Sequence, residues 1–230
     1  FLYKPVFVGD RIVSYLCAMT HHQDIGGRVA GGNACDSTEI YQEGLRIPPI
    51  KLFEGGKINP AVWRILEKNV RVPDMVLGDV RSQIAAATVA EREFLHMVDD
   101  HGVEEMQGYM ADILDSTERL TRAELTKLPQ GQWEFTDYID DDGISNDPIK
   151  IHVTVSIDGP DAYLDFTGTS PQAKGAINPN LAFTKSLAYA AFKCVLNQDV
   201  PANAGFFRPF HVTAPEGSFV NPQHPAPVAA

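Results

Sequence analysis

The chain has 230 residues, of which 44% are hydrophobic and 21% are charged, a composition that predicts a folded protein rather than a disordered one. Its 30 acidic and 19 basic side chains give a formal net charge of −11, which argues against binding to nucleic acid or to an anionic membrane surface. No apolar run approaches the roughly 20 residues that span a bilayer, and the first residues do not follow the plan of a signal peptide.

The first segment, residues 1–58, is predicted to form a β-hairpin followed by a long loop region. Val6-Phe7-Val8 and the residues after the Gly9-Asp10 turn are rich in β-branched and aromatic side chains. The second strand leads into the motif HHQDIGG at residues 21–27, and polar residues followed by glycines at a strand end commonly present a site. The loop region after it is long enough to be functional or to cover something.

Residues 59–128 are predicted to be helical. Asn59 is placed to cap a short helix from Pro60 to about Lys68. A longer helix is expected from Pro73 to about Asp100, and a third from about Glu104 to Lys127. The short link between the two long helices predicts an antiparallel helical hairpin.

Residues 129–230 begin with a predicted antiparallel meander that exposes one face to solvent. Apolar and polar residues alternate from Trp133 to Ile139 and again from Ile149 to Ile157. Asp158-Gly159-Pro160 then turns the chain into a third strand over residues 162–167.

An alanine-rich helix is expected over about residues 181–196, and because it is apolar nearly all round it is expected to be deeply buried. A short strand is expected near Phe210 to Thr213. The three segments together predict an α+β fold of mixed layers, with all 230 residues in one continuous domain. Because the chain starts at Phe1 and stops after a Pro- and Ala-rich stretch with no closing element, we expect a fragment of a larger subunit.

The residues His21-His22-Gln23-Asp24 are the strongest candidate for chemistry, because imidazole and carboxylate groups together suit a divalent metal such as zinc or manganese. Neighbours on an extended strand point to opposite faces, so His21 and His22 do not easily share one ion. A break in the strand at His21 would bring Asp24 round, as a ligand or as a partner that orients an imidazole. A His-His pair is more often hydrogen-bonded structure, and two ligands fall short of the three that a catalytic zinc requires.

Other features have a simpler structural interpretation. The run Asp140-Asp141-Asp142-Gly143 departs from a calcium-binding loop and is expected to be a solvated turn. Arg71, Asp79 and Arg81 lie at predicted helix ends, where charge pairs that close the helix termini explain them at least as well as substrate binding. The Gly-Gly pairs match neither a P-loop nor a GxGxxG pattern, so ATP is not expected to bind this chain.

The three cysteines, Cys17, Cys35 and Cys194, are odd in number and widely spaced, with no CxxC pair. This pattern argues against a disulfide framework and for a reducing compartment, so we expect a cytoplasmic protein. The three side chains are expected to be small, at least half-buried hydrophobic groups.

Seven blocks in order along the chain resemble the hydantoinase B/oxoprolinase family. They are HHQDIGG (21–27), EGLRIPPIKL (43–52), NVRVP (69–73), GDVRSQ (78–83), LPQG (128–131), DFTGTS (165–170) and PEGS (215–218). The resemblance covers nearly the whole chain and implies mixed α and β layers without a simple barrel or Rossmann topology. It also implies an ATP-dependent amidohydrolase that is active only with a partner, an actin-like subunit of the hydantoinase A type that binds ATP and phosphorylates the substrate oxygen.

The resemblance also implies that this type of subunit holds a divalent metal near the activated intermediate. The ligands implied by the resemblance are a His-x-x-Asp from an upstream Gly-Gly-Thr-His block and one histidine from the block HHQDIGG. His21 matches that histidine, and His22 is the alternative. The upstream block is missing from this chain, so the chain alone is expected to bind metal poorly. The resemblance assigns no catalytic residue here beyond the metal candidates His21, His22 and Asp24.

Three functions fit these observations. The first is a subunit of a hetero-oligomeric cyclic amide hydrolase, and the second is a subunit of a ketone carboxylase that acts on acetone or acetophenone. The third is a non-catalytic assembly module, in which the Pro- and Gly-rich stretches 44–56 and 200–227 dock a partner.

Overall fold

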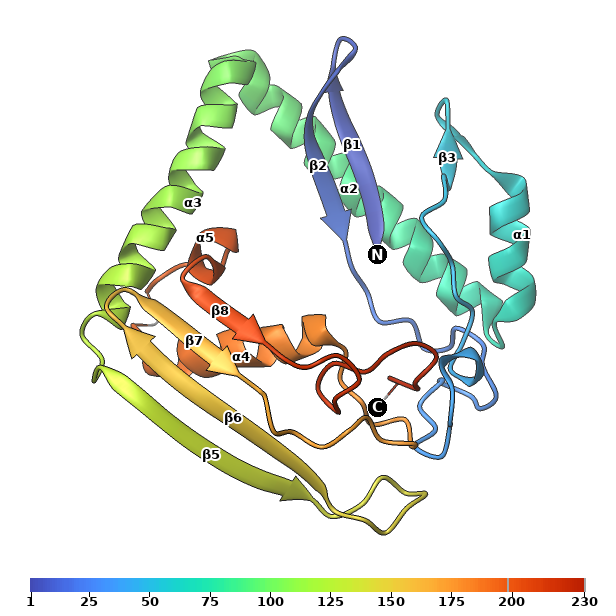
Figure 1. The fold of residues 1–230 in the computed structure, drawn as a ribbon. Coiled ribbons are helices and arrows are strands. Elements are labelled where there is room, and N and C mark those ends of the chain that lie inside the picture. The colour runs from blue at the N-terminus through green and yellow to red at the C-terminus, as the bar shows by residue number, and fades with distance from the viewer. Residues whose placement is uncertain (198, 230) are drawn as a thin grey trace. The chain divides into compact units, whose positions relative to one another are not determined.

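The computed structural model describes residues 1–197 and 199–229 (Figure 1). The chain divides into two compact units, the first made of Phe1–Gly32 with Gly44–Met110 and the second of Asn33–Glu43 with Ala111–Ala230. These units do not follow the expected segments 1–58, 59–128 and 129–230. Part of the first loop region joins the C-terminal unit, and the helical segment is divided at Met110.

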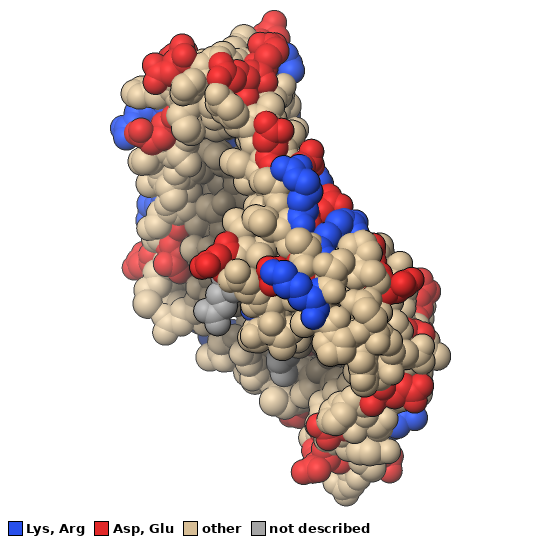
Figure 2. All heavy atoms as spheres, turned by 90° about the vertical axis from the view of Figure 1, so that its left-hand side faces the viewer, with Lys and Arg blue, Asp and Glu red and all other residues tan. Residues whose placement is uncertain are grey.

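The surface carries the excess of acidic residues that the net charge of −11 requires. Acidic side chains gather in several patches on the face shown in Figure 2, with basic side chains between them. Within the described residues, no helix combines the length and the apolar character needed to cross a membrane.

The first unit is built on a β-hairpin that packs against a long helix. Strands β1 (Leu2–Val8) and β2 (Arg11–Ala18) pair antiparallel, as predicted, and Gly9 has a φ of 59° in the turn between them. Val6 and Val13 pack against Phe94 and Val98 of α2 (Pro73–His101), which buries the inner face of the hairpin.

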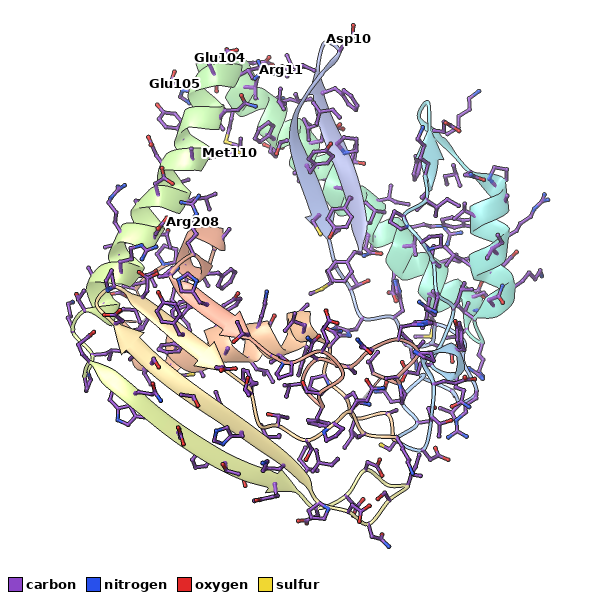
Figure 3. All side chains as sticks on the ribbon, in the orientation of Figure 1. Asp10, Arg11, Glu104, Glu105, Met110 and Arg208 are labelled. Carbon is purple, nitrogen blue, oxygen red and sulfur yellow. The ribbon has the colours of Figure 1, made fainter. Side chains whose placement is uncertain are left out.

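The turn of the hairpin lies at the start of α3 (Val103–Leu125), where Figure 3 labels Arg11 and Glu104. Nη1 of Arg11 is 3.3 Å from Oε1 of Glu104. Both side chains are exposed, so this ion pair adds little to stability. The apolar contacts of Val6 and Val13 therefore hold the hairpin in place.

The predicted helices are confirmed to within a few residues. In α1 (Pro60–Asn69), Oδ1 of Asn59 accepts hydrogen bonds from the backbone N–H groups of Ala61 and Val62, so the expected cap is present. Within the first unit, Met106 in the first turns of α3 packs against Phe94 and Val98 near the end of α2. From Ala111 on, α3 belongs to the second unit, so the antiparallel pairing of the two long helices stays a prediction.

Short elements interrupt the loop region that precedes α1. The 3₁₀ helix η1 (Ile40–Gln42) lies in the second unit, whereas β3 (Phe53–Glu54) and β4 (Lys57–Ile58) form a small hairpin in the first unit. Gly55 and Gly56, at the turn of that hairpin, have positive φ angles that favour glycine.

The second unit contains a four-stranded sheet in the order β5-β6-β7-β8. The predicted meander is confirmed as β5 (Gly131–Ile139), β6 (Ile149–Asp158) and β7 (Asp161–Asp165). The predicted strand near Phe210 is β8 (Phe210–Thr213), and it extends the sheet by pairing parallel to β7.

One face of this sheet packs on two helices, α4 (Leu181–Val195) and the short α5 (Ala204–Phe207). Ala162 and Leu164 of the sheet form a core with Phe192 of α4 and Phe206 of α5. The whole molecule is therefore a mixed α and β structure, as predicted.

Two predictions of burial are wrong. Only one side of α4 is buried, through Thr184, Ala188 and Phe192, whereas Leu187 on the other side is 55% exposed. On the edge strand β5, Trp133 and Phe135 are exposed although their alternation predicted a covered face. Burial depends on what lies opposite a residue, and the local pattern does not carry that information.

The prediction of half-buried cysteines is also wrong. Cys17, Cys35 and Cys194 are free thiols, and all three residues are exposed. Cys17 pairs in register with Tyr3 on the hairpin and lies on its outer face. The apolar residues around Cys17 correctly predicted that it lies in a strand, β2. They did not show which face of the hairpin α2 covers.

Candidate functional site

The candidate site is the loop that follows β2, and Asp24 organises it. Asp24 is 3% exposed, and its side chain accepts four hydrogen bonds. Oδ1 accepts from the backbone N–H groups of Gly26 at 3.0 Å and Arg71 at 2.9 Å. Oδ2 accepts from the N–H of Gly31 at 3.1 Å and from Nη1 of Arg71 at 2.8 Å. A carboxylate has about four lone-pair sites, so both oxygens are fully used.

Arg71 ties this loop to the link between α1 and α2. Besides its bond to Asp24, its guanidinium donates to the carbonyl oxygens of Gly26, Gly27 and Val29, at 3.3, 2.7 and 3.1 Å. The backbone N–H of Arg71, with those of Gly26 and Gly31, holds the pKa of Asp24 far below its usual range, although burial acts in the opposite direction. Asp24 therefore remains a carboxylate wherever the protein is folded near neutral pH.

The two imidazoles of the motif have different surroundings. Nδ1 of His22 lies 3.4 Å from Oδ2 of Asp79 on α2, and the His22 side chain is largely buried. If Nδ1 carries the hydrogen, Nε2 keeps its lone pair and can bind a metal or accept a proton. His21 is exposed and makes no hydrogen bond to another described residue.

One turn after Asp79, the buried side chain of Gln83 fixes the end of β2 on α2. Its Nε2 donates to the carbonyl oxygen of Ala18 at 3.0 Å. Asp79 and Gln83 thus lie on the side of α2 that faces the strand end and the following histidines. The sequence marked both residues within the block GDVRSQ, but it gave no sign that α2 supports the histidine loop.

The donor set for a metal is partial in this chain. Within the part of the chain that the structure describes, no three His, Cys, Asp or Glu side chains are grouped closely enough to hold an ion. His22 and Asp79 are two potential ligands that lie close together, and His21 directly precedes His22 in the chain. Asp24 would have to give up at least one of its four hydrogen bonds to act as a ligand, so its role as one stays a prediction.

A second buried carboxylate corrects the prediction of a solvated turn at residues 140–143. Asp142 is 5% exposed and accepts four backbone hydrogen bonds. The donors are the N–H groups of Ile144, Ser145, Lys174 and Gly175, at 2.9, 2.6, 2.9 and 3.0 Å. Burial alone would raise the pKa of Asp142, but these bonds outweigh it and lower the pKa to about 2.

Comparison with known proteins points to the same family as the seven sequence blocks do, along the whole chain. The family model described as hydantoinase B/oxoprolinase matches residues 1–230. A protein of Pseudomonas sp. (strain NS671), provisionally named as the B component of a D-/L-hydantoinase, is 34% identical over 238 residues, which cover 98% of this chain and 40% of that protein.

Two solved structures resemble the chain closely. The crystal structure of ATP-dependent caprolactamase from Pseudomonas jessenii has a TM-score of 0.92 at 32% identity, over 99% of this chain and 40% of that one. A nucleotide-free structure of acetone carboxylase has a TM-score of 0.89 at 16% identity, over 98% of this chain and 32% of that one, and this likeness concerns the fold alone. The chain spans about 40% of the length of the relatives that exceed 30% identity.

Proposed function

Because the chain belongs to the hydantoinase B/oxoprolinase family, we propose that it forms part of a subunit of an ATP-dependent enzyme that hydrolyses a cyclic amide. The supporting observation is the match over all 230 residues, together with relatives named as a hydantoinase component and as an ATP-dependent caprolactamase. The chain has no glycine motif for phosphate, so ATP binds to a partner subunit of the actin-like hydantoinase A type. The resulting hetero-oligomer works in the cytoplasm.

In this proposal, the histidine loop delivers one imidazole to a divalent metal such as zinc or manganese. His21 is the preferred ligand, since its ring makes no hydrogen bond to another described residue, and His22 is the alternative, since Asp79 can fix its tautomer. When bound, the ion polarises the carbon–oxygen group of the activated amide and lowers the pKa of water.

Asp24 acts by positioning. Its four hydrogen bonds set the path of the backbone immediately after both histidines, and Arg71 fixes that path to the helices. His21, His22 and Asp79 fit part of a metal site, and the remaining ligands come from outside the described residues.

The decisive experiment measures metal content and ring-opening activity of the full-length enzyme with its partner subunit. His21→Ala and His22→Ala are compared with His96→Ala, which changes an exposed histidine on α2. The variant that removes the ligand is expected to lose most of the metal and the activity, while His96→Ala keeps both. If His21→Ala and His22→Ala both keep normal metal content and activity, neither imidazole is a ligand.

A ketone carboxylase subunit is the second candidate, favoured by the fold shared with acetone carboxylase. The higher identity to caprolactamase, 32% against 16%, makes the hydrolase the better proposal. ATP turnover that requires bicarbonate and acetone or acetophenone, and that fails with cyclic amides, would select the carboxylase. An assembly module without chemistry would still co-purify with the ATP-binding partner and leave enzyme activity intact when both histidines are replaced by alanine.

A further inference from the structure

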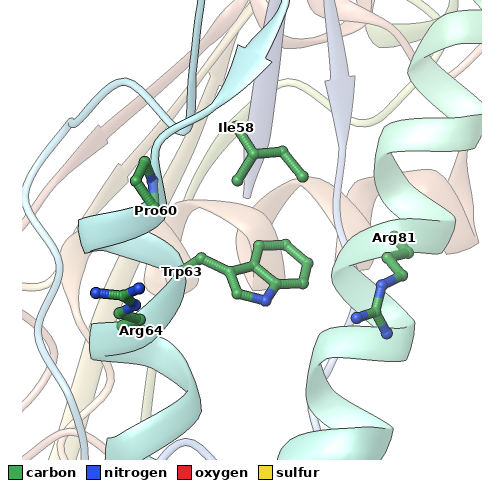
Figure 4. Close-up of a pocket in the computed structure, with 5 residues that line it drawn as sticks. All are labelled: Ile58, Pro60, Trp63, Arg64 and Arg81. Atoms are coloured by element: carbon green, nitrogen blue, oxygen red, sulfur yellow. The ribbon is translucent and has the colours of Figure 1, made fainter.

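The first unit also contains a pocket between α1 and α2, with a volume of about 320 Å³ (Figure 4). It is lined by Ile58, Pro60, Trp63, Arg64 and Arg81. The Trp63 side chain projects from α1 toward α2, and the guanidinium carbon of Arg81 lies 5.1 Å from the centre of the indole. The pocket thus combines an aromatic wall with a cation that is held beside it.

Among the described residues, the charge of Arg81 has no anionic partner. Arg81 is exposed, and it makes no hydrogen bond or ion pair with any residue that the structure describes. The same holds for Arg64, which lines the pocket from α1. The uncompensated guanidinium of Arg81 beside the indole, in a chain of net charge −11, makes this spot locally attractive to anions.

We propose that this pocket binds a small carboxylate with an apolar body. A guanidinium such as that of Arg81 can donate two parallel hydrogen bonds to one carboxylate. Ile58, Pro60 and the Trp63 ring offer apolar surface for a hydrocarbon or planar part next to it.

A phosphate group fits this pocket less well. The start of α1 lies close by, but Asn59 already occupies the N–H groups of Ala61 and Val62 that would bind a phosphate there. The pocket also uses none of the residues His21, His22, Asp24 or Asp79, so binding here does not depend on the metal chemistry proposed above.

The test titrates hexanoate into the chain carrying Trp133→Phe, in which Trp63 is the remaining tryptophan. Saturable change in Trp63 fluorescence is expected with hexanoate, and much weaker change with hexan-1-ol, acetate or inorganic phosphate. Arg81→Gln is expected to weaken hexanoate binding by about tenfold or more, since it removes a charge-assisted hydrogen-bond donor. Arg92→Gln, which alters an arginine paired with Glu93 on the same helix, is expected to bind as the parent does.

Calorimetry with the unaltered chain, and with Trp63→Leu, checks the result without relying on fluorescence. Trp63→Leu is expected to weaken binding, because the aromatic wall is lost. The proposal is overturned if hexanoate binds no better than hexan-1-ol or phosphate, if Arg81→Gln binds hexanoate like Arg92→Gln, or if no heat of binding is measured. Circular dichroism on each variant separates lost binding from lost folding.

Discussion

Two buried aspartates organise loops of this chain in the same way. Asp24 and Asp142 each accept four hydrogen bonds, and most of the donors are backbone N–H groups. The sequence marked Asp24 as a candidate metal ligand or orienting partner and Asp142 as part of a solvated turn, and it marked neither as the centre of a hydrogen-bonded loop. Their partners could not be predicted, because Arg71 lies 47 residues from Asp24 and Gly175 lies 33 residues from Asp142.

Replacing Asp24 by asparagine is expected to destabilise the fold in a pH-dependent manner. The folded-state pKa of Asp24 is lowered, so its stabilising effect is full above the ordinary Asp pKa of about 3.9 and is lost as pH falls toward the folded-state pKa. The difference in unfolding free energy between the parent chain and Asp24→Asn should therefore be larger at pH 7 than at pH 3. Urea unfolding followed by circular dichroism at both pH values measures it.

The matched control for this comparison is Asp112→Asn, at an exposed position on α3 whose side chain makes no hydrogen bond to another described residue. It should change the unfolding free energy by less than about 0.5 kcal/mol at either pH. A cost of Asp24→Asn that is the same at pH 7 and pH 3 would contradict the assigned role of the carboxylate charge.

Gly26, in the same loop, is expected to tolerate no side chain. Its φ is 87°, and a Cβ atom there would lie 2.6 Å from the carbonyl oxygen of Asn69. Gly26→Ala should cost more than the ~1–2 kcal/mol of left-handed strain alone. Gly9→Ala isolates that strain, since Gly9 has a φ of 59° with open space around it. Equal losses of unfolding free energy in the two variants would show that the loop moves away from Asn69 without cost.

At the scale of elements, local patterns predicted where helices and strands lie but not what covers them. The cap at Asn59 and the alternation in β6 are local signals, and both elements appear where expected. The exposed side of α4 and the exposed aromatic residues of β5 depend on neighbours that periodicity does not describe. The parallel pairing of β8 with β7 depends in the same way on a contact between distant segments.

The two faces of α4 should differ sharply in their contribution to stability. Phe192 is buried, and its ring lies 4.7 Å from that of Phe210, so Phe192→Ala is expected to cost about 3 kcal/mol or more. Leu187 is exposed, so Leu187→Ala should cost less than about 1 kcal/mol. Denaturant unfolding of the two variants gives both values. If Leu187→Ala costs as much as Phe192→Ala, the outer face of α4 is covered in solution.

At the scale of the whole molecule, the sequence led to the right family because its seven blocks are spread along the entire chain. It also singled out the histidine loop, whose role stays a prediction, but it did not reveal that Arg71 in the link before α2, and Asp79 and Gln83 on α2, contact that loop and the strand end before it. A metal site needs at least three converging ligands, and a motif in one stretch of chain cannot show how many others approach it in space.

The partial donor set predicts that this chain by itself binds zinc weakly. His21, His22 and Asp79 do not form a group of three ligands within the described residues, whereas a catalytic zinc takes three protein ligands. If the full-length protein holds the proposed metal, the chain should bind zinc more than about 100-fold more weakly than the full-length protein does, since even a lost supporting group lowers metal affinity about 10- to 100-fold. Competition with a chromophoric chelator measures both affinities under one set of conditions. Equal affinities, abolished in the chain when His21 and His22 are both replaced by alanine, would mean that these 230 residues complete the site unaided.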